Sequence, residues 1–318
     1  MRRGLPLAFL ALLAAGPARA AMYEQAELAA ERPRIEARVA ELHARVTLHP
    51  HLPADAARLA VVEVRVPDLG QNGHPLGFAS DGTVVVLPLA GLRFIEDLTM
   101  AYAWRYREGR TLEPFDEYLA MLRWRPEADW PGGTYLDPLE AFGVPERVWE
   151  RDPAVGDLGT RLRNEAWAFI LAHELAHIHY RHPGNAVAPA LSQANETAAD
   201  AFALDLLERA GTIPMGAILY FQATVAFSGS RAEQPSDAAF ARWKREEATH
   251  PVNSQRLLAI AAHLGRSAAR AGDPVRAETL GFIAANLADI AADLDDPAMQ
   301  QLIVRRAVYG DPADLRKR

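Results

Sequence analysis

The sequence predicts an α+β fold that is predominantly helical, with a small β-sheet near the N-terminus and a helical C-terminal part. Two β-branched runs, Leu59–Val66 and Thr83–Leu87, are bounded by turn-forming residues, which is typical of short strands. From Arg161 to Arg318, by contrast, apolar residues recur at helical spacing between glycine and proline breaks. The strands are therefore expected early in the chain and most of the helices late.

The helices can be placed in order along the chain. The segment Glu24–Leu48 carries one apolar stripe and predicts an exposed leading helix. Helical spacing returns from Leu92 to about Leu122, and a stretch dense in Trp, Pro and Gly follows from Trp124 to Asp157. Such a long connection can be a lid, but a packed irregular segment is the preferred interpretation. Further helices are expected at Arg161–Arg181, Ala194–Ala210, Met215–Phe227, Asp237–Glu247, Asn253–Ala271, Pro274–Asp293 and Pro297–Tyr309.

Composition excludes several classes of protein. The chain has 318 residues, 50% of them apolar and 24% charged, which is typical of a globular protein. Its formal net charge of -7 argues against a basic, phosphate-binding face, so nucleic acid is not an expected partner. Because the chain has no cysteine, disulfides, thiol nucleophiles and cysteine zinc sites are excluded. Any metal must be bound by His, Asp or Glu.

The N-terminus is typical of an export signal. Arg2 and Arg3 precede an apolar run from Leu5 to Ala15, and Ala18-Arg19-Ala20 is a small-residue cleavage site. We expect residues 1–20 to be a signal peptide and the mature chain to be periplasmic, with secretion as the alternative. The longest later apolar stretch, Gly216–Phe227, falls short of the roughly 20 residues that cross a bilayer. A transmembrane segment is therefore not expected in the mature chain.

The segment His173-Glu174-Leu175-Ala176-His177 carries the clearest chemical signal. Residues four apart share one face of a helix, so His173 and His177 can direct ring nitrogens at one ion. Glu174 lies about 100° round the helix, beside that face, where a carboxylate can act as general base on a water molecule. This pattern indicates hydrolysis by a metal-activated water.

A third ligand must come from elsewhere, because catalytic zinc usually takes three protein ligands and one water. Glu196, on the next predicted helix, is the candidate. Asp200, one turn further on, can accept a hydrogen bond from the outer nitrogen of a ligand histidine. The alternative, two solvated histidines on an amphipathic helix, leaves unexplained why ionisable groups directly follow the apolar run Trp167–Leu171.

These segments resemble the gluzincin zinc metallopeptidases, in particular the HtpX-type and CAAX-prenyl-protease-type enzymes and their soluble periplasmic relatives. The resemblance implies a zincin-like core, one Zn²⁺ per chain held by two helices, endopeptidase activity and a protein or peptide substrate. The matching segments are Gly77–Ala79 with Thr83–Val86 and Gly91-Leu92, His173–His177 with Arg181-His182, Asn195-Glu196 with Ala199-Asp200, and Thr249–Pro251 with Arg256.

The resemblance also implies further roles. The strand Thr83, Val84, Val85 and Val86 would receive extended substrate by edge pairing, although it can equally be a half-buried strand. His250 could stabilise the oxyanion of the tetrahedral intermediate, although a His-Pro pair is more often only a helix start. Arg256 is expected as the structural partner of a carboxylate such as Asp200.

The chain departs from the family in its long insertion, about 93–160, and in lacking the usual membrane helices. We expect a peptidase domain over residues 21–250 and a C-terminal helical extension over 251–318, with exported or misfolded envelope proteins as substrates. Prenylated substrates are not expected. The alternative is a zinc-stabilised binding or chaperone-like protein without catalytic activity.

Overall fold

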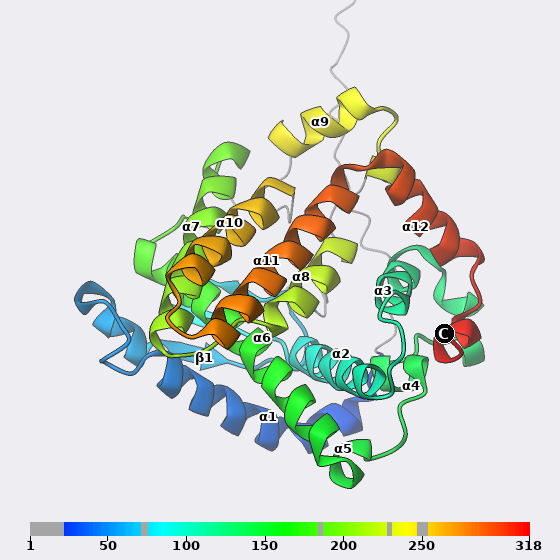
Figure 1. Ribbon diagram of the computed structural model, residues 1–318, viewed down its shortest axis with the longest axis horizontal. Helices are drawn as coiled ribbons and strands as arrows, with labels where there is room; N and C mark the ends of the chain where they lie inside the picture. The colour runs from blue at the N-terminus through cyan, green and yellow to red at the C-terminus, as the bar shows by residue number, and fades with distance from the viewer. Residues whose placement is uncertain (1–21, 71–75, 184–186, 228–230, 247–253) are drawn as a thin grey trace, which may run out of the picture.

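The computed structural model describes residues 22–70, 76–183, 187–227, 231–246 and 254–318 (Figure 1). The fold is mostly helical, with a small mixed three-stranded sheet near the N-terminus, as the sequence predicts. Buried residues from most of the helices and from one strand form one large hydrophobic cluster. The predicted signal peptide, residues 1–20, lies outside the described residues.

The N-terminal part comprises helix α1 (Gln25–Val46), a 3₁₀ helix (Ala54–Val61) and strands β1 (Glu63–Arg65), β2 (Ala79–Ser80) and β3 (Val84–Val86). The strand order is β1-β3-β2, with β1 parallel and β2 antiparallel to β3. The predicted strand Leu59–Val66 is wrong over its first half. The alanine-rich segment before it forms the 3₁₀ helix, and this helix extends to Val61 and buries Leu59 completely. Only Glu63–Arg65 therefore pairs in the sheet.

The long predicted insertion is part of the packed core. It forms α2 (Leu89–Arg107), α3 (Pro114–Trp124) and the short helices α4 (Pro138–Phe142) and α5 (Val148–Arg151), with 3₁₀ turns at Glu127–Asp129 and Pro131–Gly133. The rings of Phe115, Tyr118, Trp130 and Phe142 are buried and contact one another. This burial agrees with the preferred interpretation of the segment from Trp124 to Asp157 as a packed irregular segment and not as a lid.

Helix α6 (Pro153–Tyr180) is the central element and carries the His-Glu-x-x-His segment (Figure 1). It begins with proline in the first turn and with the Asp152 carboxylate accepting a hydrogen bond from the backbone N–H of Ala154, a strong helix start. It contacts α1, α2, α7 and α8 as well as β2 and β3. Every residue from Glu165 to Ala176 is buried, because protein surrounds the helix there.

The remaining helices follow the sequence prediction closely. They are α7 (Pro189–Arg209), α8 (Gly216–Phe227), α9 (Asp237–Glu246), α10 (Ser254–Arg270), α11 (Pro274–Asp295) and α12 (Pro297–Tyr309), with 3₁₀ turns at Arg231–Glu233 and Pro312–Arg316. Helix α10 packs on α7 and α11, and α12 packs on α3 (Figure 1). Among the described residues, no helix has both the length and the apolar character that crossing a membrane requires.

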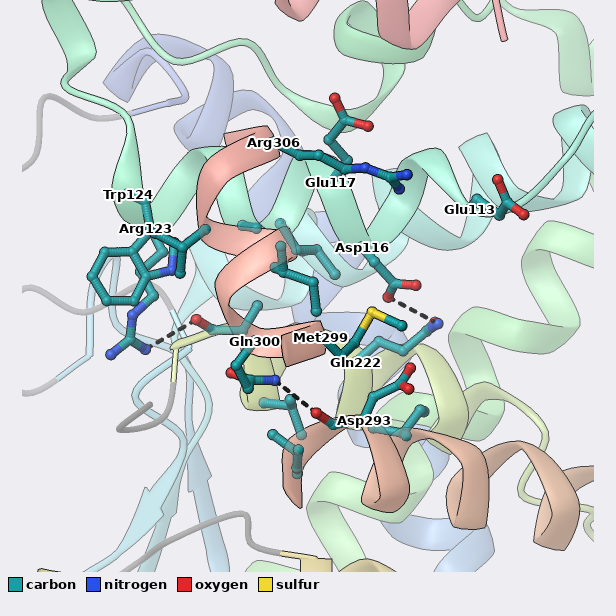
Figure 2. A pocket seen from close by; sticks show the side chains of 18 residues that line it. Glu113, Asp116, Glu117, Arg123, Trp124, Gln222, Asp293, Met299, Gln300 and Arg306 are labelled. Carbon is teal, nitrogen blue, oxygen red and sulfur yellow. Dashed lines mark hydrogen bonds between the residues drawn. The ribbon is translucent and has the colours of Figure 1, made fainter. Parts of the chain in front are cut away.

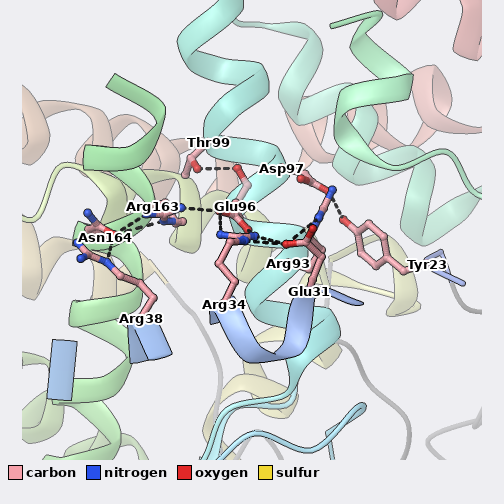
Figure 3. A network of polar contacts seen from close by, with 10 residues as sticks. All are labelled: Tyr23, Glu31, Arg34, Arg38, Arg93, Glu96, Asp97, Thr99, Arg163 and Asn164. Atoms are coloured by element: carbon pink, nitrogen blue, oxygen red, sulfur yellow. Dashed lines mark hydrogen bonds and ion pairs between the residues drawn. The ribbon is translucent and has the colours of Figure 1, made fainter. Parts of the chain in front are cut away.

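A polar network connects α1 and α2 to the N-terminal half of α6 (Figure 3). The Glu96 carboxylate of α2 accepts hydrogen bonds from Arg34 of α1 at 2.6 and 2.9 Å and from Arg163 of α6 at 2.5 Å. Burial would raise the pKa of Glu96, but the two guanidinium groups outweigh it and lower that pKa. The carboxylate therefore stays ionised and joins three helices at one point.

Candidate metal centre

Two neighbouring helices bring the three predicted ligands together. His173 and His177 lie one turn apart on α6, and Glu196 faces them from α7. The two Nε2 atoms are 3.1 Å apart. One oxygen of Glu196 lies 3.3 Å from Nε2 of His173 and the other lies 3.5 Å from Nε2 of His177. All three side chains are at least 86% buried, since their exposed fractions are 6%, 14% and 6%.

This arrangement fits a tetrahedral zinc ion. Two atoms bound about 2.0–2.2 Å from one zinc at the tetrahedral angle lie roughly 3.3–3.6 Å apart, close to the observed separations. Two imidazoles and one carboxylate are also a donor set that zinc accepts in catalytic sites, where the fourth position is left to solvent. His173, His177 and Glu196 are therefore the residues that would hold a metal ion.

Asp200 and Arg256 support the ligands from outside. Nδ1 of His173 lies 2.9 Å from Oδ1 of Asp200, which leaves Nε2 directed at the other ligands. Arg256 of α10 donates hydrogen bonds to both oxygens of Asp200, and its Nη1 lies 3.0 Å from Oε2 of Glu196. Asp200 therefore lies between the outer nitrogen of His173 and the guanidinium group of Arg256.

Charge dominates the ionisation of this buried group. Burial alone would lower the pKa of His173, but the carboxylates of Asp200 and Glu196 raise it to about 10 in the metal-free protein. Burial would raise the pKa of Asp200, but Arg256 and His173 lower it. A cation, whether a proton or a metal ion, is therefore strongly favoured between the imidazole of His173 and the carboxylates.

His182 contacts the outer side of His177, a contact that the sequence prediction missed. Helix α6 ends at Tyr180, the backbone of the next residue, Arg181, is left-handed (φ 56°), and the N–H of His182 donates to the carbonyl of His177. This turn folds the chain back, so that the Nδ1 atoms of His182 and His177 are 3.0 Å apart. Helical spacing could not reveal the contact, because His182 lies beyond the end of the helix.

Glu174 and Tyr220 are two buried residues close to the candidate metal centre. Glu174 is buried on α6, one residue from His173. Tyr220 is a buried residue of α8, and its ring contacts that of Phe169 on α6. Burial raises the pKa of Tyr220, Arg256 opposes this, and the Glu174 carboxylate raises it further. The Tyr220 hydroxyl therefore stays protonated and can donate a hydrogen bond at neutral pH.

Two other site features were predicted, the substrate strand and His250. Strand β3 has hydrogen-bonded partners on both sides, so Val84, Val85 and Val86 offer no free edge for the substrate pairing that was predicted for them with Thr83. The N–H and hydroxyl of Thr83 donate to Oδ1 of Asp81 in the preceding turn. The outer edge on that side of the described sheet belongs to β2. His250 lies outside the described residues.

A cavity of about 400 Å³ lies elsewhere, between α3, α8, α11 and α12 (Figure 2). Figure 2 shows Asp116 and Gln222 pointing toward one another across it, and the Gln222 amide donates to Asp116 at 3.4 Å. None of the residues that line this cavity belongs to the His173–His177–Glu196 group or to its supporting contacts. The cavity is therefore distinct from the candidate metal centre.

The fold and the site together define a helical protein with a buried His-His-Glu group that could hold a metal ion, and with Glu174 next to the first of these histidines. Comparison with protein families is consistent with a hydrolytic role: residues 127–272 match the model of the family described as Peptidase U49. The matched segment includes α6, α7 and α10, which contribute the three candidate ligands, Glu174, Asp200 and Arg256. No curated protein and no solved structure matches the chain.

Proposed function

We propose that the protein is a zinc-dependent endopeptidase of the gluzincin type. The observation that carries this proposal is the spacing of the three donor atoms, which fits one tetrahedral ion, with the buried Glu174 next to His173 on the same helix. The similarity of residues 127–272 to a peptidase family supports hydrolysis of peptide bonds.

Zinc, when bound, supplies a Lewis acid that lowers the pKa of water and polarises the scissile carbonyl. Glu174 accepts the proton of the attacking water and passes it to the leaving amine, so one carboxylate serves first as base and then as acid. The protonated hydroxyl of Tyr220 is the nearby donor that can stabilise negative charge as it develops on the carbonyl oxygen.

The proposed substrates are exported or misfolded proteins of the cell envelope, bound as extended chains. Backbone pairing with a strand can hold such chains with little dependence on sequence. The outer edge of β2 (Ala79–Ser80) replaces β3 in this role, because β2 lies beside α6 and has a partner on one side only within the described sheet. The periplasmic location rests on the signal-like N-terminus alone.

The deciding experiment compares wild-type protein with Glu174→Gln for zinc content and for cleavage of unfolded casein, with and without a chelator. We expect Glu174→Gln to retain zinc while cleavage falls by roughly 10²–10⁴-fold, because only the proton-transfer group is removed. Glu196→Ala should lose the zinc itself. Glu278→Gln, at an exposed position on α11, is the matched control and should cleave like the wild type.

Each other outcome has a clear meaning. Cleavage retained by purified Glu174→Gln would remove the general-base assignment. Bound zinc without any chelator-sensitive cleavage by the wild type would support the zinc-stabilised binding protein instead.

A further inference from the structure

Asp205 and Glu208 of α7 and His263 of α10 form a second cluster of metal-ligating side chains. Each offers one donor atom within 4.8 Å of the other two, and Nε2 of His263 lies 3.4 Å from Oδ1 of Asp205. That last distance falls within the separation expected for two ligands of one tetrahedral ion, roughly 3.3–3.6 Å. This group shares no residue with the His173–His177–Glu196 centre.

The histidine nitrogen that faces this cluster is buried without a hydrogen bond. Nε2 of His263 is inaccessible to solvent and has no hydrogen-bond partner within the part of the chain that the structure describes. The His263 side chain is 13% exposed, whereas that of Asp205 is 55% exposed, so the cluster opens to solvent on the Asp205 side. A buried polar atom of this kind is expected to have a partner, and a metal ion that enters from solvent would supply one.

The chemistry of the donor set is that of a divalent-metal site. Two carboxylates balance the charge of one divalent ion, and a neutral imidazole adds the nitrogen ligand that zinc favours over calcium or magnesium. Glu208 is already oriented, because the Ser267 hydroxyl of α10 donates a 2.9 Å hydrogen bond to its Oε2. Water would complete the coordination on the exposed side.

We infer that Asp205, Glu208 and His263 bind a second zinc-like divalent cation, which fastens α10 to α7. The sequence alone predicts one zinc per chain, and this proposal makes the number two. It does not depend on the proposed peptidase activity, because it rests on a different set of side chains.

The position of the cluster gives the second ion a role. Contacts between α10 and α7 run in the same direction along both helices. They pass from Arg256 and Asp200 to His263 and Asp205, and then to Ser267 and Glu208. His263 lies about two turns beyond Arg256 on the same face of α10. A cation that ties His263 to α7 therefore keeps Arg256 seated on Asp200, which in turn supports the ligand His173.

The test is metal stoichiometry, measured by mass spectrometry after equilibration of each full-length variant with buffered Zn²⁺. We expect two ions for wild type and for His49→Ala, a control at an exposed histidine of the leading segment. We expect one ion for His263→Ala and one for Glu208→Gln, which keeps the size of the side chain. Glu196→Ala should retain the second ion, and the Glu196→Ala/His263→Ala double variant should bind none.

A second readout protects this test against variants that fold poorly. Zn²⁺ should raise the Tm of Glu196→Ala, because the ion binds the folded state, and this rise should vanish when His263→Ala or Glu208→Gln is added. If His263→Ala and Glu208→Gln both keep the wild-type number of ions, the second site does not exist and His263 forms only an ion pair with Asp205. Failure of the first centre would show separately, as one ion in wild type and none in His263→Ala.

Discussion

The guanidinium group of Arg256 holds both carboxylate oxygens of Asp200, with Nε 2.6 Å from Oδ2 and Nη2 2.8 Å from Oδ1. Arg256 belongs to α10 and Asp200 to α7. Helix α10 carries no candidate ligand of this centre, yet its Arg256 holds Asp200 in place. Burial would raise the pKa of Asp200, but Arg256 lowers it and keeps the carboxylate ionised beside Nδ1 of His173. The orientation of a ligand histidine therefore depends on a residue two contacts away.

Replacing Arg256 should weaken metal binding and destabilise the fold. In Arg256→Gln, two buried carboxylates lose their positive partner, which typically costs about 3–5 kcal/mol of the free energy of unfolding. Loss of such outer support typically weakens metal affinity by roughly 10–100-fold. Competition with a zinc indicator measures the affinity, and urea unfolding measures the stability.

Arg266→Gln is the matched control, because Arg266 is exposed on the same helix. It should leave zinc affinity and stability close to the wild-type values. Equal zinc affinity in Arg256→Gln and Arg266→Gln would show that Asp200 does not need Arg256 to orient His173.

Tyr220→Phe should separate metal binding from catalysis. The variant loses only the hydroxyl, so zinc content should stay unchanged while kcat falls by roughly 10²-fold, as expected for the loss of one donor to a developing oxyanion. Tyr106→Phe, at a position 64% exposed, is the control and should retain full kcat. A Tyr220→Phe enzyme with wild-type kcat would exclude the hydroxyl from the reaction.

The candidate ligands could be predicted from the sequence because their geometry is local. The spacing of His173 and His177 places both on one face of a helix, and Glu196 and Asp200 share a face for the same reason. Most helices after Arg161 were also predictable, because proline, glycine and apolar spacing mark their ends and buried faces.

The remaining features depend on contacts between distant segments. The place of β3 in the middle of the sheet is set by pairing with β1 and β2, which a β-branched run does not encode. Tyr220 lies in an apolar stretch that predicts only a buried helix, and its closeness to Glu174 arises from the packing of α8 on α6. Val61 and Val62 favour a strand, but Ala54–Val61 forms a 3₁₀ helix that buries Leu59 in the core.

Glu165 should make the stability of the protein depend on pH. Burial raises the pKa of Glu165 to about 7, and the hydrogen bond from the N–H of Gly216 opposes this rise. Because the folded state holds this proton more tightly than the unfolded state, the contribution is complete below about pH 4.5 and is lost as pH rises through 7. The loss is on the order of 3 kcal/mol.

Glu165→Gln tests this dependence, because the amide keeps an acceptor for the Gly216 N–H but cannot ionise. We expect the stability difference between variant and wild type to grow in favour of the variant between pH 5 and pH 8, as measured by urea unfolding at each pH. Other ionisable groups contribute equally to both proteins and cancel in the difference. Parallel pH profiles would show that Glu165 ionises normally in the folded state.

Gly216 marks the closest approach of α8 to α6, and alanine should not be tolerated there. An added Cβ would lie 1.9 Å from the carbonyl oxygen of Leu162 and 2.6 Å from the backbone nitrogen of Ala166. These backbone atoms of α6 cannot turn aside as a side chain can, so α8 would have to move, carrying Tyr220 with it. We expect Gly216→Ala to lose roughly 3 kcal/mol or more of the free energy of unfolding.

Gly281→Ala, inside α11 where a Cβ meets open space, should instead gain about 0.5–1 kcal/mol, because alanine favours the helix. Urea unfolding of the two variants should therefore shift in opposite directions, and a stable Gly216→Ala protein would show that α6 and α8 pack less closely than described.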